Sequence, residues 1–212
     1  MLAKRVALDS QSLLDVDSSV WGQIQGERIR LAFTPLDRQP SEYVKVLGKN
    51  WDYGEIGRII LKSVHNSEEI FFFLEWEDST RDVELKDSFP DGAGLLFPLK
   101  WDAPIDTMGE KDWPVNAWYW RADIEGRGRS FTAEGLGTTQ ETTNSPIKVQ
   151  ANWKDGIWSL VMGRALSVED ETVQFEIGGT YKVGCAVWQG SNNERAGLKS
   201  YSNSWYELEL ED

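Results

Sequence analysis

The chain has 212 residues, of which 40% are hydrophobic and 27% charged, so it is long enough to bury a core without disulfides or a structural metal ion. Its 22 Lys and Arg residues against 35 Asp and Glu residues give a formal net charge of -13, which disfavours nucleic acid and anionic membranes as partners. Cys185 is the only cysteine and His65 the only histidine. These single residues exclude an internal disulfide, a thiolate zinc site, an iron–sulfur cluster, a covalently attached haem and any site built on a histidine cluster.

Short segments of strand character follow one another along the chain, and turn residues separate them. Triplets at 65–67 and 154–156 predict hairpin turns. The pattern predicts an all-β fold in one domain over 1–212: an antiparallel β-sandwich, or an open barrel, with long functional loops and at most short helices. The predicted strands are 28–33, 56–64, 69–76, 94–99, 115–124, 131–133, 147–153, 157–166, 172–177, 182–188 and 205–210.

The segment 69–76 is apolar on both faces. Phe71 and Phe73 point to one side, and Phe72, Leu74 and Trp76 point to the other. This pattern predicts a central strand. The 11 Trp residues of the chain predict aromatic packing around a flat group, or a surface that binds by stacking.

Two long irregular segments interrupt the strands, 100–114 with Met108 and 189–202 with Lys199. Long loops on a rigid β scaffold are common places for function. If the strands that follow them begin at the same end of the sandwich, both loops meet at one rim.

The other residues and motifs of the chain give little evidence for a functional site. His65 has no nucleophile motif beside it and is interpreted as a polar turn residue. The carboxylates are numerous, but most lie in turns or at strand ends, which does not favour a glycosidase pair. The glycine-rich segments 92–94 and 126–129 do not open a helix, so they are interpreted as turns and not as phosphate-binding loops.

The segments 107–122 and 194–202 resemble the haem b-binding γ subunit of ethylbenzene dehydrogenase and of steroid C25 dehydrogenase, within the dimethyl sulfoxide reductase family of molybdenum enzymes. The most specific part is the Met-Gly pair at 108–109 followed by Pro-Val-Asn-Ala-Trp-Tyr-Trp at 114–120. The segment 91–98 and Trp21 also fit, and the resemblance runs nearly from end to end.

The resemblance implies that a methionine thioether and a lysine amine, at Met108 and Lys199, are the axial ligands of one non-covalent, low-spin haem b. With both axial positions filled by protein, the iron has no open position for substrate. Lysine binds iron only as the neutral amine, and holding it neutral at pH 7 costs roughly 4–5 kcal/mol. Burial lowers that cost. The residues proposed for the haem pocket by their closeness in sequence are Trp118, Tyr119, Trp120, Arg121 and Tyr201.

The function implied by the resemblance is electron transfer, with no catalytic site in this chain. The γ subunit would relay electrons from an iron–sulfur β subunit to an external acceptor such as a cytochrome. A catalytic α subunit with the molybdenum cofactor would oxidise a hydrocarbon or a steroid side chain. The chain shows no signal peptide or membrane span and by itself predicts a cytoplasmic protein. The resemblance implies the periplasm instead, reached with a partner that carries a twin-arginine signal.

The alternative function is a carbohydrate-binding β-sandwich module without haem. Such modules are also rich in tryptophan, and they bind sugars on exposed, coplanar indoles. The loop residues Trp51, Trp101 and Trp113 are the candidates for that face.

Overall fold

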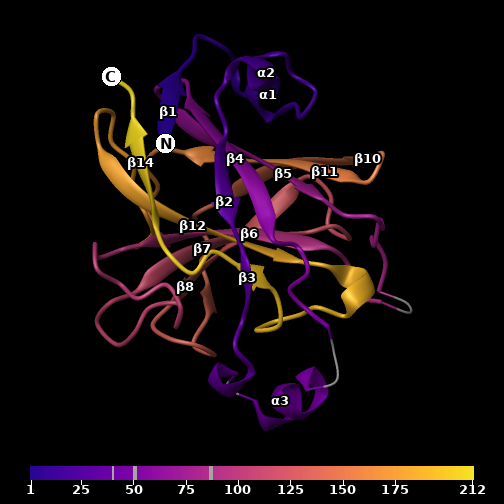
Figure 1. Ribbon diagram of the computed structural model, residues 1–212. Coiled ribbons are helices and arrows are strands. Elements are labelled where there is room, and N and C mark those ends of the chain that lie inside the picture. Colours follow the sequence, from indigo (N-terminus) through magenta and orange to yellow (C-terminus); the bar gives the residue numbers. More distant parts are fainter. Residues whose placement is uncertain (40, 50–51, 86–87) are drawn as a thin grey trace.

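The computed structural model describes residues 1–39, 41–49, 52–85 and 88–212. Its architecture is mostly β, with short helices, as the sequence predicts (Figure 1). The helices are α1 (Ser10–Leu14), α2 (Val20–Gln23), η1 (Leu36–Arg38), α3 (Glu42–Gly48) and η2 (Gly190–Asn192). The strands are β1 (Leu2–Arg5), β2 (Glu27–Arg30), β3 (Ala32–Phe33), β4 (Arg58–His65), β5 (Glu69–Glu77), β6 (Gly92–Pro98), β7 (Val115–Arg121), β8 (Arg127–Ala133), β9 (Gln140–Glu141), β10 (Ile147–Lys154), β11 (Ile157–Ala165), β12 (Thr180–Trp188), β13 (Ser200–Tyr201) and β14 (Tyr206–Leu210).

The prediction of a sandwich is wrong in one respect, because the strands close into a barrel. Among the described residues, ten strands follow one another in the order β14-β1-β4-β5-β11-β10-β8-β7-β6-β12, and β12 pairs again with β14. The closure comes from β12, whose first part, from Thr180 to Val183, pairs with β14, whereas the part from Gly184 to Trp188 pairs with β6. A strand that changes partner along its length joins two sheets, and sequence alternation does not report such a change.

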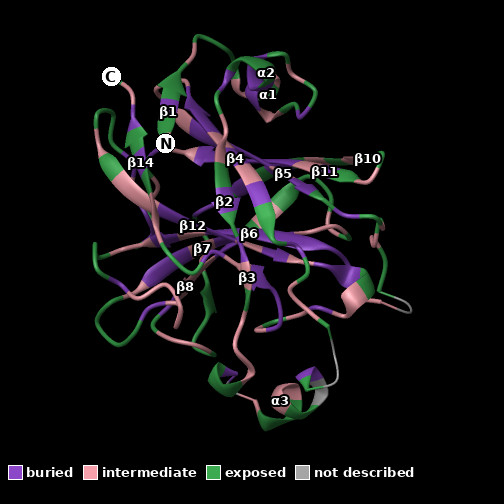
Figure 2. Ribbon diagram, viewed as in Figure 1, coloured by how far each residue is buried: buried purple, intermediate pink, exposed green. Residues whose placement is uncertain are grey.

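The interior of the barrel is a large apolar core, seen as the buried central strands in Figure 2. β5 lies between β4 and β11, which confirms it as a central strand. Phe72, Leu74 and Trp76 belong to the main core. Phe71 and Phe73 pack on the other side, in the cluster that α1 and α2 cover.

Tryptophan side chains fill much of this core. Trp76 stacks on Trp158 with ring centroids 6.2 Å apart, and Trp120 meets Trp158 edge-on at 5.1 Å. Trp118 packs edge-on against Phe72. These indoles therefore explain part of the tryptophan content by core packing and not by a flat ligand.

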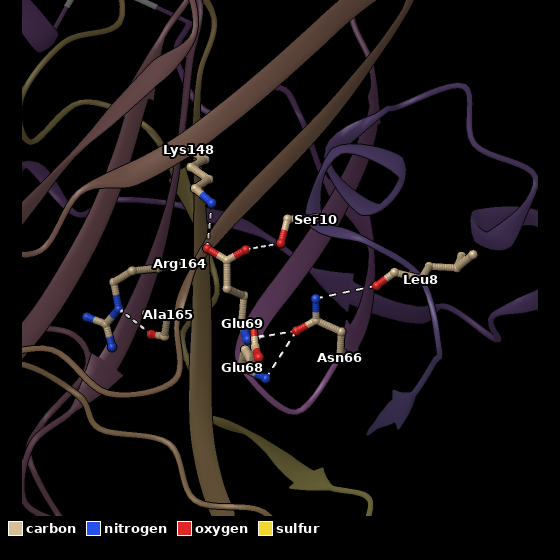
Figure 3. Close-up of polar contacts among 8 residues, drawn as sticks. All are labelled: Leu8, Ser10, Asn66, Glu68, Glu69, Lys148, Arg164 and Ala165. Carbon is tan, nitrogen blue, oxygen red and sulfur yellow. Dashed lines mark hydrogen bonds and ion pairs between the residues drawn. The ribbon is translucent and has the colours of Figure 1, made fainter.

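Both predicted hairpins are present. Asp155 and Gly156, with φ of 52° and 81°, form the turn between β10 and β11. In the turn between β4 and β5, the Asn66 side-chain oxygen accepts the N–H groups of Glu68 and Glu69 at 3.1 and 2.8 Å (Figure 3). The Glu69 carboxylate also pairs with Lys148 of β10 at 2.6 Å, which links this end of β5 to the neighbouring hairpin.

Several predicted segments differ in the structure. The glycine-rich segment 92–94, interpreted as a turn, begins strand β6. The predicted strand 28–33 is divided into β2 and β3. Residues 172–177 form no strand; Val173 and Phe175 are buried, but Phe175 N–H bonds to Leu166 O and the Arg164 guanidinium donates to Val173 O. Apolar residues alternate in this segment because they are buried in the core, although its backbone pairs with no neighbouring strand. The turn predicted at 126–129 is confined to Gly126, because residues 127–129 already belong to β8. No helix among the described residues is long and apolar enough to cross a membrane.

His65 is interpreted from the sequence as a polar turn residue, but it is the last residue of β4 and its side chain is buried. Neither ring nitrogen makes a hydrogen bond of ordinary distance and angle with a described residue. Burial lowers the pKa of the imidazole, so the folded state favours the neutral ring.

We expect acidification below about pH 6.5 to destabilise the fold through His65, because the unfolded chain takes up this proton more readily than the folded one. The measurement is urea unfolding of the wild type and of His65→Gln across this range. The wild type should lose more free energy of unfolding than the variant as pH falls. If the free energy of unfolding depends on pH equally in the two proteins, His65 is not the cause of the loss of stability.

Candidate functional site

A mostly apolar cavity of about 320 Å³ lies on the outer face of β6, β7 and β12, within the usual size range of small-molecule sites. Strand alternation places the core residues Leu95, Trp118 and Cys185 on the inner face of the same strands. The cavity and the core are thus opposite sides of one sheet.

Small residues hollow out the floor of the cavity. In the strand register Ala186 lies beside Gly94, and Gly94 lies beside Tyr119. In the next row Gly184 lies beside Leu96, which lies beside Ala117. A Cβ on Gly94 would lie 3.0 Å from the Trp118 carbonyl oxygen and 3.5 Å from the Trp188 ring, so the space above this position depends on glycine.

Met108 lines the cavity from the loop between β6 and β7. Its φ of 57° lies in the left-handed region, which non-glycine residues rarely adopt and which tends to occur where function demands it. The backbone is held there because Met108 N–H donates to Ile105 O and Gly135 N–H donates to Met108 O. The half-buried side chain packs against a small apolar cluster of Ala103, Val115 and Ala133.

Lys199 lines the same cavity from the residue before β13 and is only 8% exposed. Its Nζ lies 3.4 Å from Ala196 O and 5.0 Å from the centroid of the Trp188 ring. The same carbonyl accepts the Trp188 indole N–H at 3.0 Å. None of the contacts described for Lys199 is with a carboxylate. Burial lowers the pKa of the Lys199 amine to about 8.

Met108 and Lys199 therefore meet at one cavity, but not at one rim. β7, β6, β12 and β13 pair antiparallel in succession, so β13 runs opposite to β7. The segments that precede these strands enter from opposite ends of the sheet. The condition for a shared rim is not met, and the two side chains instead approach the cavity from two ends.

The other predicted pocket residues divide into two groups. Tyr119 and Tyr201 line the cavity, whereas Trp118 borders it while its ring packs in the core. Trp120 lies in the core, and Arg121 pairs with Asp123 outside the cavity lining. Closeness in sequence thus selected residues from both faces of β7.

Trp188, Ile105 and Leu136 also line the cavity and were not predicted. Alternation along β12 could have indicated Trp188, because Cys185 and Val187 face the core and Ala186 and Trp188 face away from it. Ile105 and Leu136 lie in loops, where no periodicity gives such a signal.

The two described indoles of the alternative sugar-binding face are exposed, but each has a lysine over its ring. Lys182 Nζ lies 4.2 Å from the centroid of Trp101, and Lys100 Nζ lies 5.5 Å from that of Trp113. Trp51 lies outside the described residues. A lysine on the ring competes with a sugar for the same surface, so this arrangement does not favour the alternative.

The fold and the cavity define a β-barrel protein with a thioether and a buried amine directed to one apolar site. The family model described as ethylbenzene dehydrogenase matches residues 18–146 and 126–200. The chain therefore belongs to the ethylbenzene dehydrogenase family.

Curated relatives agree with this family. The chain is 36% identical over 150 residues to a protein of Haloferax mediterranei named as respiratory nitrate reductase heme subunit ORF7, with 69% of the chain and 53% of the relative covered. It is 32% identical to chlorate reductase subunit gamma of Ideonella dechloratans, with 71% and 64% covered. It is 31% identical to dimethylsulfide dehydrogenase subunit gamma of Rhodovulum sulfidophilum, with 90% and 73% covered. The match thus spans between about half and three quarters of each relative's length.

The fold is also similar to that of a carbohydrate-binding module of family 9 from Caldicellulosiruptor kristjanssonii, solved with glucose. The TM-score is 0.56 at 8% identity, covering 100% of this chain and 95% of the module. At this identity the likeness concerns the fold alone.

We expect Lys199→Met to stabilise the ligand-free protein at about pH 7, by roughly 3 kcal/mol. The folded pKa of about 8 lies some two and a half units below 10.5, and each unit corresponds to about 1.36 kcal/mol. The folded pKa is the lower one, so wild-type stability should rise between about pH 8 and pH 10.5, and the advantage of the variant should shrink there.

The measurement is chemical unfolding of wild type and variant at both ends of this pH range, with the exposed Lys4→Met as the control. A Lys199→Met protein that is no more stable than the wild type at neutral pH would show that the buried amine carries no such penalty.

Proposed function

We propose that this chain is an electron-transfer subunit that holds one haem b between Met108 and Lys199. The observation that carries the proposal is that these two side chains, far apart in sequence, line one apolar cavity. The donor set fits the group, because a thioether and an amine without a carboxylate partner are both available as neutral ligands. When bound, the haem iron would supply reversible one-electron chemistry.

The surroundings of Lys199 lower the cost of the neutral amine that an iron ligand requires. An amine with a pKa of about 8 needs only roughly 1–2 kcal/mol to be neutral at pH 7, against the 4–5 kcal/mol of an exposed lysine. The Ala196 carbonyl oxygen and the Trp188 ring hold Nζ at the cavity. Met108 as the second ligand would favour a raised reduction potential.

The chain is proposed to have no catalytic role of its own, because Met108 and Lys199 would together leave the haem iron no open position for a substrate. The gamma-subunit and heme-subunit names of its relatives support a place in a multi-subunit molybdenum oxidoreductase. We propose that it accepts electrons from an iron–sulfur β subunit, beside a molybdenum α subunit that oxidises a hydrocarbon or steroid side chain, and passes them to an external acceptor such as a cytochrome. The proposed compartment is the periplasm, reached by export with a twin-arginine partner.

We expect the purified protein to be coloured and to give a haem b Soret and α band on reduction. Met108→Leu and Lys199→Ala should each change the spectrum and lower haem retention, because each removes one axial ligand. Measurement of the reduced spectrum and midpoint potential tests this. Unchanged spectra and potentials in both variants would refute the ligand assignment, and a colourless protein retained on a polysaccharide column would favour the sugar-binding alternative.

We expect Ala186→Leu to abolish haem binding while leaving the fold intact, because the larger side chain would occupy the floor of the cavity outside the core. The matched control is Ala7→Leu at an exposed position. Haem titration followed by absorbance, together with circular dichroism, separates the two effects. Wild-type haem affinity in Ala186→Leu would place the haem elsewhere.

A further inference from the structure

A second polar cluster lies away from the cavity, where residues 78–82 and Asp91, from the connection between β5 and β6, meet the turn 189–194. Figure 1 shows η2 of this turn beside the loop that joins β5 to β6. The Gly190 N–H donates to Asp91 Oδ1 at 2.8 Å, which ties the two segments together. Asp78 and Glu194 are each only 2% exposed, and Asp91 is fully buried.

Two of these carboxylates have complete structural roles. Asp91 accepts the N–H groups of Gly190 and Asp82, both at 2.8 Å, and the indole N–H of Trp158 at 3.0 Å. Glu194 accepts Gly54 N–H and Gln189 N–H at 2.7 and 2.9 Å. Each carboxylate therefore uses both of its oxygens to hold backbone in place.

Asp78 and Asp82 differ, because each uses only one oxygen. Asp78 Oδ1 accepts from Thr80 N–H at 3.1 Å and from Gln189 Nε2 at 3.3 Å, and Asp82 Oδ1 accepts from the Ser88 hydroxyl at 2.8 Å. Oδ2 of both residues is buried and has no hydrogen-bond partner among the residues that the structure describes. Buried oxygens of this kind are rare and costly, so each needs a physical account.

A bound cation accounts for these oxygens, because a positive ion can take the place of the missing hydrogen-bond donor. Its charge would also offset the cost of burying the Asp78 carboxylate, which is only 2% exposed.

The ligand chemistry of the cluster is that of a hard cation. Thr80 Oγ1 and Ser191 Oγ lie 3.0 Å apart and bring neutral oxygens from both segments. The single His65 and Cys185 of the chain belong to other regions. No group of three or more His, Cys, Asp or Glu side chains in the described part of the chain is arranged to hold a metal ion, so neutral oxygens have to complete the site. Calcium accepts such mixed oxygen sets, whereas magnesium demands stricter geometry.

We propose that a calcium-class divalent cation binds between residues 78–82 and the turn 189–194, with Asp78 Oδ2 and Asp82 Oδ2 as its charged ligands. The cation would fix the start of the segment that leads from η2 to Lys199. The site stands apart from the haem proposal, because none of these residues lines the cavity.

The test is terbium luminescence on chelator-treated protein. Trp153 donates its indole N–H to Asp78 O at 3.0 Å and Trp158 donates to Asp91, so both indoles are close enough to sensitise a bound lanthanide. We expect saturable emission at about one ion per chain, displaced by calcium more readily than by magnesium. Asp78→Asn and Asp82→Asn should weaken calcium binding on the order of 10–100-fold, and the exposed Asp17→Asn should not.

Absence of calcium-displaceable emission from the wild type would overturn the proposal, as would wild-type calcium affinity in both variants or stronger displacement by magnesium. If Asp78→Asn does not fold, the half-buried Asp82 decides the question through Asp82→Asn. Haem absorbance is recorded on the same samples. A wild-type protein that binds terbium but shows no haem absorbance counts against the haem proposal. A wild-type protein that shows haem absorbance but no terbium emission counts against the cation site.

Discussion

The Lys199 amine lies in an apolar cavity without a carboxylate partner, and the proposed site depends on this burial. The same desolvation that penalises the ammonium in the ligand-free chain makes the neutral amine available as a ligand. The cavity exists because Gly94, Ala117 and Ala186 leave room on the outer face of the sheet, while the inner face carries the core. The buried amine therefore lowers the stability of the ligand-free chain, and ligand binding at the same cavity can restore it.

The architecture explains how two distant residues reach one cavity. β12 pairs with β14 over its first half and with β6 over its second half, so it both closes the barrel and supplies the cavity floor. The antiparallel order of β7, β6, β12 and β13 sends the Met108 and Lys199 segments in from opposite ends. A flat ligand between them would be held from two sides by loops that are anchored to the same sheet.

Part of this organisation could be predicted from the sequence. The two-faced pattern of 69–76 identified the central strand β5, and the Asp155-Gly156 pair identified a hairpin, because both signals are local. The closure of the barrel was not predictable, because it depends on β12 changing partner along its length. The non-strand segment around Phe175 was mistaken for a strand because burial imitates strand alternation.

The residues of the site also divide into those that the sequence could indicate and those that depend on how the strands are ordered. Met108 and Lys199 came from resemblance and not from periodicity, and their meeting at one cavity depends on strand order, which no local pattern reports. Tyr119 and Tyr201 were predicted by closeness in sequence, but Trp120 faces the core because neighbouring strand residues alternate in direction. Trp188 could have been found from alternation along β12. Ile105 and Leu136 lie in loops that carry no such signal.

The most direct measurement of the central claim is near-infrared magnetic circular dichroism, together with electron paramagnetic resonance, of the oxidised haem-loaded protein. These spectra report the identity and field strength of both axial ligands. The account predicts a low-spin ferric signal with a thioether-to-iron charge-transfer band and an amine as the opposite ligand. A high-spin signal, or a low-spin signal without a thioether band, would contradict coordination by Met108 and Lys199.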